Sequence, residues 1–263
     1  MSATIAANMI GADFLKLRKK RGTLIWALVL ALAPLLIFFI VRAAQHSSSP
    51  TANPAAGGVG GYTDALRLLA MFFGPLAAIM IGTDGGAGDI ASGVFRDLVV
   101  TGRSRLALFA ARVPAALALC WLVVGAGYLL TILGTYLFAS GTPTPDGALL
   151  ANGLGFALLS TGVVCAVAVG FASLTASRPA ALTVLIGWHL VASPILASIS
   201  SLGSTRKIVL SQAVAHFSPV SLGDRGPRGA TVAMGGGTAL VVLALWLAAF
   251  LALGAWRTRT MDA

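Results

Sequence analysis

DGGAGDIASGVFRDLVVTGRSRLALFAAR, residues 84–112, is a polar island between two long hydrophobic blocks. It holds three of the eight acidic residues and four of the eighteen basic residues of the chain. The blocks on either side, about 65–82 and 107–139, are apolar enough to span a bilayer. A charged, glycine-rich segment cannot lie in lipid, because its backbone groups and charges would be unsatisfied there. We therefore expect the island in water at a membrane face, where a soluble partner can reach it.

The composition is that of a membrane protein rather than a soluble domain. Of the 263 residues, 57% are hydrophobic and 10% are charged, whereas soluble domains carry about 25% charged residues. The length allows about six spans of about 20 residues and leaves no room for a water-soluble domain of catalytic size. The net charge is +10, and the basic residues adjoin hydrophobic spans. This placement indicates membrane lipid, not nucleic acid, as the partner of the positive charge.

Residues 1–22 are predicted to form a cytoplasmic interfacial helix. Ile10, Phe14 and Leu17 follow a helical spacing, and five basic residues lie between 16 and 21. An apolar stripe beside a basic cluster is typical of a helix that lies on the membrane surface, and a plain positive-inside tail is the alternative. The apolar run over 23–41 exceeds the core of a signal peptide, about 7–15 residues, so we expect an uncleaved first span.

We expect an all-α integral membrane protein with one membrane domain over 23–256 and a cytoplasmic tail over 257–263. A flexible external loop is predicted over 42–63, and the middle of the external segment 201–229 can form a half-inserted helix. With both termini cytoplasmic, twelve Lys and Arg residues lie inside and six outside, which favours this orientation. The six expected spans cover about 23–41, 64–82, 106–139, 148–176, 180–200 and 231–256.

The sequence lacks the patterns that would indicate an enzyme or an ion-coupled carrier. His46, His189 and His216 lie in different segments without metal-ligand spacing, and no GxxxxGK[ST] phosphate loop exists. The predicted span interiors contain no acidic residue, which disfavours a secondary transporter driven by protons or sodium. A multi-pass enzyme acting on lipid would need His, Asp, Glu or Ser side chains converging at one face. We therefore expect no catalytic residue, metal or cofactor in this chain.

A few residues inside the predicted spans stand out. His189 is the one ionisable side chain near the middle of a span. It can face a substrate path, or it can be a neutral imidazole that is hydrogen-bonded between helices. Gly162, Ala166 and Gly170 form a small-xxx-small face, which lets helices approach closely.

Residues 93–105, GVFRDLVVTGRSR, resemble the cytoplasmic loop after span 2 of type-2 ABC transporter permeases. The family pattern is G-T-x-x-x-L-x-x-[TS]-P-x-S-R, followed further along by Lys. This chain departs from the pattern at Val94, where Thr is usual, and at Gly102, where Pro is usual; Arg112 stands in place of the Lys. The acid that commonly precedes the pattern would be Asp89 or Asp84. The matching residues are Gly93, Leu98, Thr101, Ser104 and Arg105.

The resemblance covers the whole layout of the chain and implies the membrane subunit of an ATP-driven exporter in the cell membrane. It implies a homodimer with two copies of a separate ABC ATPase subunit, which binds the ATP and Mg. Residues 94–105 would then be the coupling helix that docks on the ATPase, and an ordinary positive-inside loop is the alternative. The implied coupling residues are Phe95, Arg96, Asp97, Leu98, Thr101, Ser104 and Arg105.

By the same resemblance, spans 2 and 5 line the substrate path. The polar or bulky side chains of these spans are the candidates for contact with substrate. An apolar and aromatic path suits an amphipathic drug, antibiotic, peptide or lipid, and a polymer remains an alternative. The path candidates are Met71, Phe72, Phe73, Trp188 and His189.

Overall fold

The structure is a computed structural model that describes residues 3–94, 99–100, 102, 104–220 and 232–261. It is all-helical, with 85% helix and no strand in the part described. The elements in chain order are α1 (Ala3–Lys19), α2 (Arg21–Ser48), α3 (Gly58–Arg67), the π-helical segment η1 (Leu68–Phe73), α4 (Gly74–Ala91), α6 (Arg105–Leu137), α7 (Gly147–Thr175), α8 (Arg178–Gly187), the π-helical segment η2 (Trp188–Ala192), α9 (Ser193–Ser198), the 3-10 segment η3 (Ser200–Ile208), α10 (Leu210–Ala215) and α11 (Gly236–Thr260).

In the part of the chain that the structure describes, six helices are long and apolar enough to cross a membrane, as the composition predicts. The second of them is the continuous run α3–η1–α4, and the fifth is α8–η2–α9. The helices extend beyond the predicted spans at three points. α2 continues to Ser48 and α3 starts at Gly58, so these helices occupy most of the predicted loop 42–63. α4 continues to Ala91 instead of ending near residue 82, because its polar residues are buried against other helices instead of facing water.

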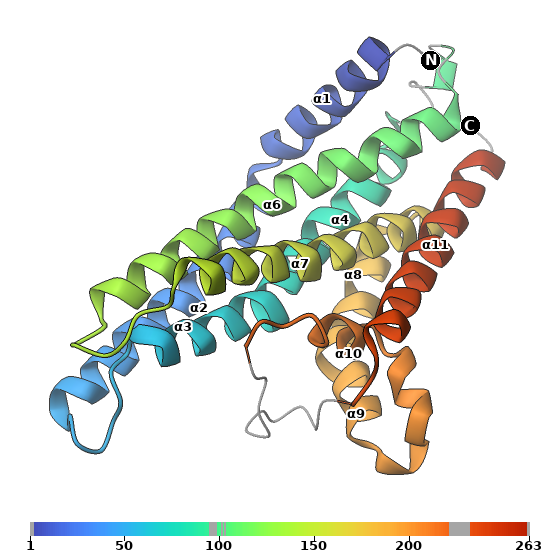
Figure 1. Cartoon of the computed structure of the whole chain (residues 1–263). Coiled ribbons are helices and arrows are strands. Elements are labelled where there is room, and N and C mark those ends of the chain that lie inside the picture. Colours follow the sequence, from blue (N-terminus) through green and yellow to red (C-terminus); the bar gives the residue numbers. More distant parts are fainter. Residues whose placement is uncertain (1–2, 95–98, 101, 103, 221–231, 262–263) are drawn as a thin grey trace.

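The spans pack around α4 and α7, which lie at the centre of the bundle (Figure 1). α6 and α11 flank α7, and α2 packs against α4 and α6. α1 packs along the first half of α6. Both termini lie at one end of the bundle, where α4 and α7 end and α6 and α8 begin. We call this end the terminal face. α1 is a helix as predicted, although its position on a membrane surface stays a prediction.

Glycines allow the close contact between α4 and α7. A Cβ atom at Gly82 would lie 2.6 Å from the carbonyl oxygen of Cys165, and one at Gly86 would overlap the carbonyl oxygen of Val169. Gly82 and Gly86 form a GxxxG pair, which permits such backbone approach. The sequence patterns did not lead us to predict this pair. The small-residue face predicted from the sequence is that of Gly162, Ala166 and Gly170 on α7.

The predicted α7 face serves two different neighbours. A Cβ atom at Gly162 would meet the Trp121 ring on α6, and one at Gly170 would overlap the backbone of Phe250 on α11. Gly254 on α11 lies opposite Gly170, because a Cβ atom there would come within 2.6 Å of the Gly170 carbonyl oxygen. The small residues of α7 therefore allow close packing on both of its flanks.

Gly86→Val should destabilise the bundle by about 3 kcal/mol, because the added side chain must push α4 away from the α7 backbone. Gly155→Val is the matched control, since a Cβ atom at this α7 position has no neighbour within 4 Å. The control should change stability by no more than about 0.5 kcal/mol. Thermal unfolding in detergent, followed by tryptophan fluorescence, measures both variants. Equal melting temperatures would contradict the close packing of α4 on α7.

At the opposite end of the bundle, Asp64 connects two spans. It forms an ion pair with Arg67, at 3.6 Å, and a second pair with Arg42 of α2, at 2.8 Å. Nearby, the hydroxyl groups of Tyr62 and Tyr128 lie 2.7 Å apart. These contacts join the outer parts of α2, α3 and α6.

Candidate functional site: a cavity and a buried charge cluster

Two carboxylates of the polar island are buried inside the bundle, contrary to the prediction that the island lies in water. Asp84 and Asp89 lie on α4 and are each 5% exposed. Arg112 of α6 is also buried. Burying charges is costly unless they are paired and hydrogen-bonded. The prediction failed because cations from distant parts of the chain, instead of water, compensate these carboxylates.

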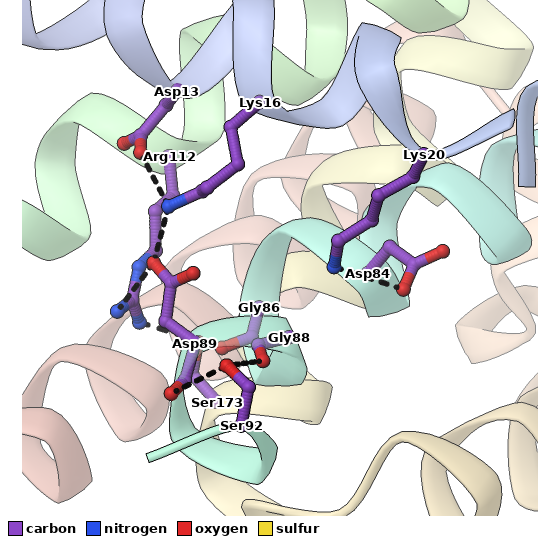
Figure 2. A network of polar contacts seen from close by, with 10 residues as sticks. All are labelled: Asp13, Lys16, Lys20, Asp84, Gly86, Gly88, Asp89, Ser92, Arg112 and Ser173. Carbon is purple, nitrogen blue, oxygen red and sulfur yellow. Dashed lines mark hydrogen bonds and ion pairs between the residues drawn. The ribbon is translucent and has the colours of Figure 1, made fainter. Parts of the chain in front are cut away.

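Asp89 pairs with cations from two helices (Figure 2). Its Oδ2 atom lies 2.6 Å from Nζ of Lys16 on α1 and 3.5 Å from Nη2 of Arg112. Arg112 also donates to the carbonyl oxygen of Gly86 at 3.4 Å, and the Ser173 hydroxyl donates to the same oxygen at 3.1 Å. The end of α4 is thereby joined to α1, α6 and α7.

Asp84 connects α4 to three further segments. Its Oδ1 atom lies 2.8 Å from Nε of Arg178, the first residue of α8, and 3.4 Å from Nζ of Lys20. Its Oδ2 atom accepts a hydrogen bond from the hydroxyl of Thr23 on α2. The pair with Arg178 joins the second span to the fifth at the terminal face. We call the six charged side chains of this region the charge cluster: Lys16, Lys20, Asp84, Asp89, Arg112 and Arg178.

An apolar cavity of about 200 Å³ lies between the second, fourth, fifth and sixth spans. It contains three of the five predicted path residues, namely Met71, Trp188 and His189. Phe72 and Phe73 do not line it; they are half-buried and adjacent, with ring centroids 6.5 Å apart. α10 and α11 contribute lining residues that were missed in the sequence, such as Ser211, Trp246 and Phe250.

Both spans that carry path candidates are distorted beside the cavity. Met71 lies in η1, and Trp188 and His189 lie in η2. Each π-helical segment is followed by a two-residue step that ends in proline, Gly74-Pro75 or Ser193-Pro194. Proline lacks the N–H that the helix ladder needs, and π-helical turns frequently occur at functional sites.

The cavity wall is mainly apolar and aromatic, with a few polar groups. Trp246 lies against Trp188 and Phe250, with ring centroids 5.7 and 5.4 Å away. The hydroxyl groups of Ser193 and Ser211 lie 2.7 Å apart. An apolar pocket with a few placed polar groups is the usual form of a small-molecule site. Its composition suits an apolar or aromatic molecule that carries one or two polar groups.

Five of the seven predicted coupling residues, Phe95, Arg96, Asp97, Leu98 and Thr101, lie outside the described residues. The other two, Ser104 and Arg105, form hydrogen bonds with described residues. Ser104 caps α6, because its Oγ accepts a hydrogen bond from the Ala107 N–H at 3.2 Å. Arg105 donates to the carbonyl oxygens of Arg259, at 3.3 Å, and Met261. Arg105 therefore ties the start of α6 to the end of α11.

Among the described residues, no group of three or more His, Cys, Asp or Glu side chains is placed to hold a metal ion. Cys120 and Cys165 are both buried as free thiols.

No protein-family model matches the chain, and a search of the curated proteins found no match.

Proposed function

We propose that this chain is the permease subunit of an ATP-driven exporter of the type-2 ABC class. The cavity is the observation that carries the proposal. It lies between the second and fifth spans, the two spans to which the family resemblance assigns the substrate path. Its wall fits an amphipathic cargo such as a drug, an antibiotic, a peptide or a lipid.

α4 connects the polar island to the cavity. The segment 92–104 follows α4 directly, and α4 carries Asp84 and Asp89 near its end and Pro75 and Ile79 in the cavity wall. A displacement of this segment by the partner ATPase would therefore move α4, which lines the cavity. The energy would come from ATP, which binds two conformations of the partner ATPase with different affinity. In this proposal the terminal face is cytoplasmic, two copies of the chain pair, and two ATPase copies dock below.

A second candidate, an ion-coupled secondary transporter, gains support from one observation. The structure buries two carboxylates, Asp84 and Asp89, which such carriers need for proton or sodium binding. Both carboxylates are already paired with cations, however, and they lie in the second half of α4, the helix that ends at the terminal face. Paired carboxylates at the end of a bundle favour a structural role over ion transport.

Affinity purification of the tagged chain from its native membrane tests the proposal. An ATPase should copurify, and its activity in the eluate should fall about tenfold or more in Arg96→Glu and in Arg96→Glu/Arg105→Glu. The single variant is needed because Arg105 also contacts the end of α11. Arg206→Glu/Lys207→Glu, at the opposite end of the bundle, is the matched control and should retain the ATPase. A chain that purifies without ATPase activity would contradict the exporter and favour the ion-coupled carrier.

A further inference from the structure

The five basic residues between positions 16 and 21, at the junction of α1 and α2, divide into two sets. Lys16 and Lys20 turn inward and pair with Asp89 and Asp84. The other three cations are exposed, and no ion pair joins them to any described residue. These are Arg18, Lys19 and Arg21. This second set provides positive charge that the described part of the protein does not neutralise.

Two apolar hollows adjoin this exposed charge. One, of about 230 Å³, lies between α1, α2 and α6, and its lining includes Leu24, Leu28 and Leu119. The other, of about 780 Å³, lies between α1, α6 and α7. Phe14 and Leu122 line both hollows, so the two hollows are neighbours. Arg18 is the one charged residue among their described lining residues.

We propose that the two hollows hold the acyl chains of one anionic diacyl phospholipid, whose phosphate group binds Arg18. Two adjoining apolar hollows match two hydrocarbon chains, and a guanidinium at the rim matches a phosphate, which it can bind through paired hydrogen bonds. Exposed Lys19 and Arg21 add positive potential beside the headgroup. The proposal requires only that the chain spans a membrane, so it stands apart from the exporter proposal and its ATPase partner.

The site would affect how α1 is held. The lipid would contact α1, α2 and α6 through one wall and α1, α6 and α7 through the other. Lys16 and Lys20 already attach this part of the chain to α4 from the opposite side. A bound lipid would therefore fix α1 in place and stabilise the folded chain.

The test measures binding of phosphatidylglycerol, with phosphatidylcholine as the zwitterionic reference, to the purified full-length chain in detergent. Native mass spectrometry counts bound lipid, and the shift in unfolding temperature on lipid titration gives an apparent affinity. One phosphatidylglycerol should remain bound per chain, and phosphatidylcholine should bind more weakly. Arg18→Gln should weaken phosphatidylglycerol binding about fivefold or more, because the variant loses the charge-assisted paired hydrogen bonds to the phosphate.

Matched variants separate a built site from general attraction. Lys19→Gln removes the same charge one residue away and lines neither hollow, so its effect should stay below about twofold. Leu122→Trp narrows both hollows and should also weaken phosphatidylglycerol binding. Leu129→Trp is its control, because Leu129 is 67% exposed on the same helix and lines neither hollow.

Three results would overturn the site. Equal losses in Arg18→Gln and Lys19→Gln would show a diffuse attraction for anionic lipid. Equal binding of the two lipids would remove the role of the Arg18 charge. If Leu122→Trp leaves lipid binding unchanged but alters the oligomeric state, the hollows belong to a contact between two copies of the chain.

Discussion

Asp89→Asn should destabilise the protein by about 3–5 kcal/mol, because it removes the buried carboxylate that is paired with the buried Arg112 guanidinium. The side chains of Arg112 and Asp89 are only 2% and 7% exposed, and water cannot replace the lost charge without opening the packing of α4 on α6. The melting temperature in detergent should fall by at least about 6 °C. Thermal unfolding followed by circular dichroism measures the change.

The control for this result is Asp13→Asn. Asp13 pairs with the same Lys16, at 3.0 Å, but that lysine keeps Asp89 as a partner when Asp13 is neutralised. The expected loss is therefore no more than about 1 kcal/mol. In the double variant Asp89→Asn/Arg112→Met, the buried cation is also absent, so a large part of the lost stability should return. A double variant less stable than Asp89→Asn would show that the pair does not account for the loss.

Composition and span length sufficed to predict the number of helices that are long and apolar enough to cross a membrane, because a hydrocarbon core requires such helices. They did not predict where the second span ends. A charged segment was expected to lie in water outside the bundle. Asp89 is instead buried and paired with Lys16, 73 positions away, and with Arg112. The signal that was available is the spacing of Lys16 and Lys20, four positions apart, which in a continuous helix would place both amines on one face.

Only some of the predicted path residues line the cavity, for a related reason. Met71, Trp188 and His189, from the two spans that the resemblance assigns to a substrate path, line a cavity, and Phe72 and Phe73 do not. A regular helical period cannot show which side chains face it, because η1 and η2 insert wider turns that rotate the following residues. Trp246 and Ser211 come from elements that only the tertiary fold brings to the site.

Arg178→Gln should open the cavity toward the terminal face. The Asp84–Arg178 pair joins the second and fifth spans at that end, while η1 and η2 distort the same two spans beside the cavity. Removing this ion pair, in which the Asp84 carboxylate is buried, should shift the open population about tenfold. Ser193 is buried and lines the cavity, so a cysteine at this position reports on access to it. The reporter variant is Ser193→Cys in a Cys120→Ala/Cys165→Ala background. It is reconstituted in nanodiscs and labelled with a water-soluble thiol reagent. The labelling rate should rise about tenfold in Arg178→Gln.

Lys20→Gln is the control that distinguishes loss of the link between the two spans from loss of one positive charge beside Asp84. Lys20 pairs with the same oxygen of Asp84, at 3.4 Å, but it belongs to the connection between α1 and α2 and not to the fifth span. Its removal should change labelling of Ser193→Cys by less than about twofold, since the link between the two cavity spans survives. Equal acceleration by Lys20→Gln would mean that the charge of Asp84, and not the link to α8, keeps the cavity closed. Unchanged labelling in Arg178→Gln would show that packing alone closes it, with the alanine contacts of Ala87, Ala172 and Ala181 holding the helices together at this end.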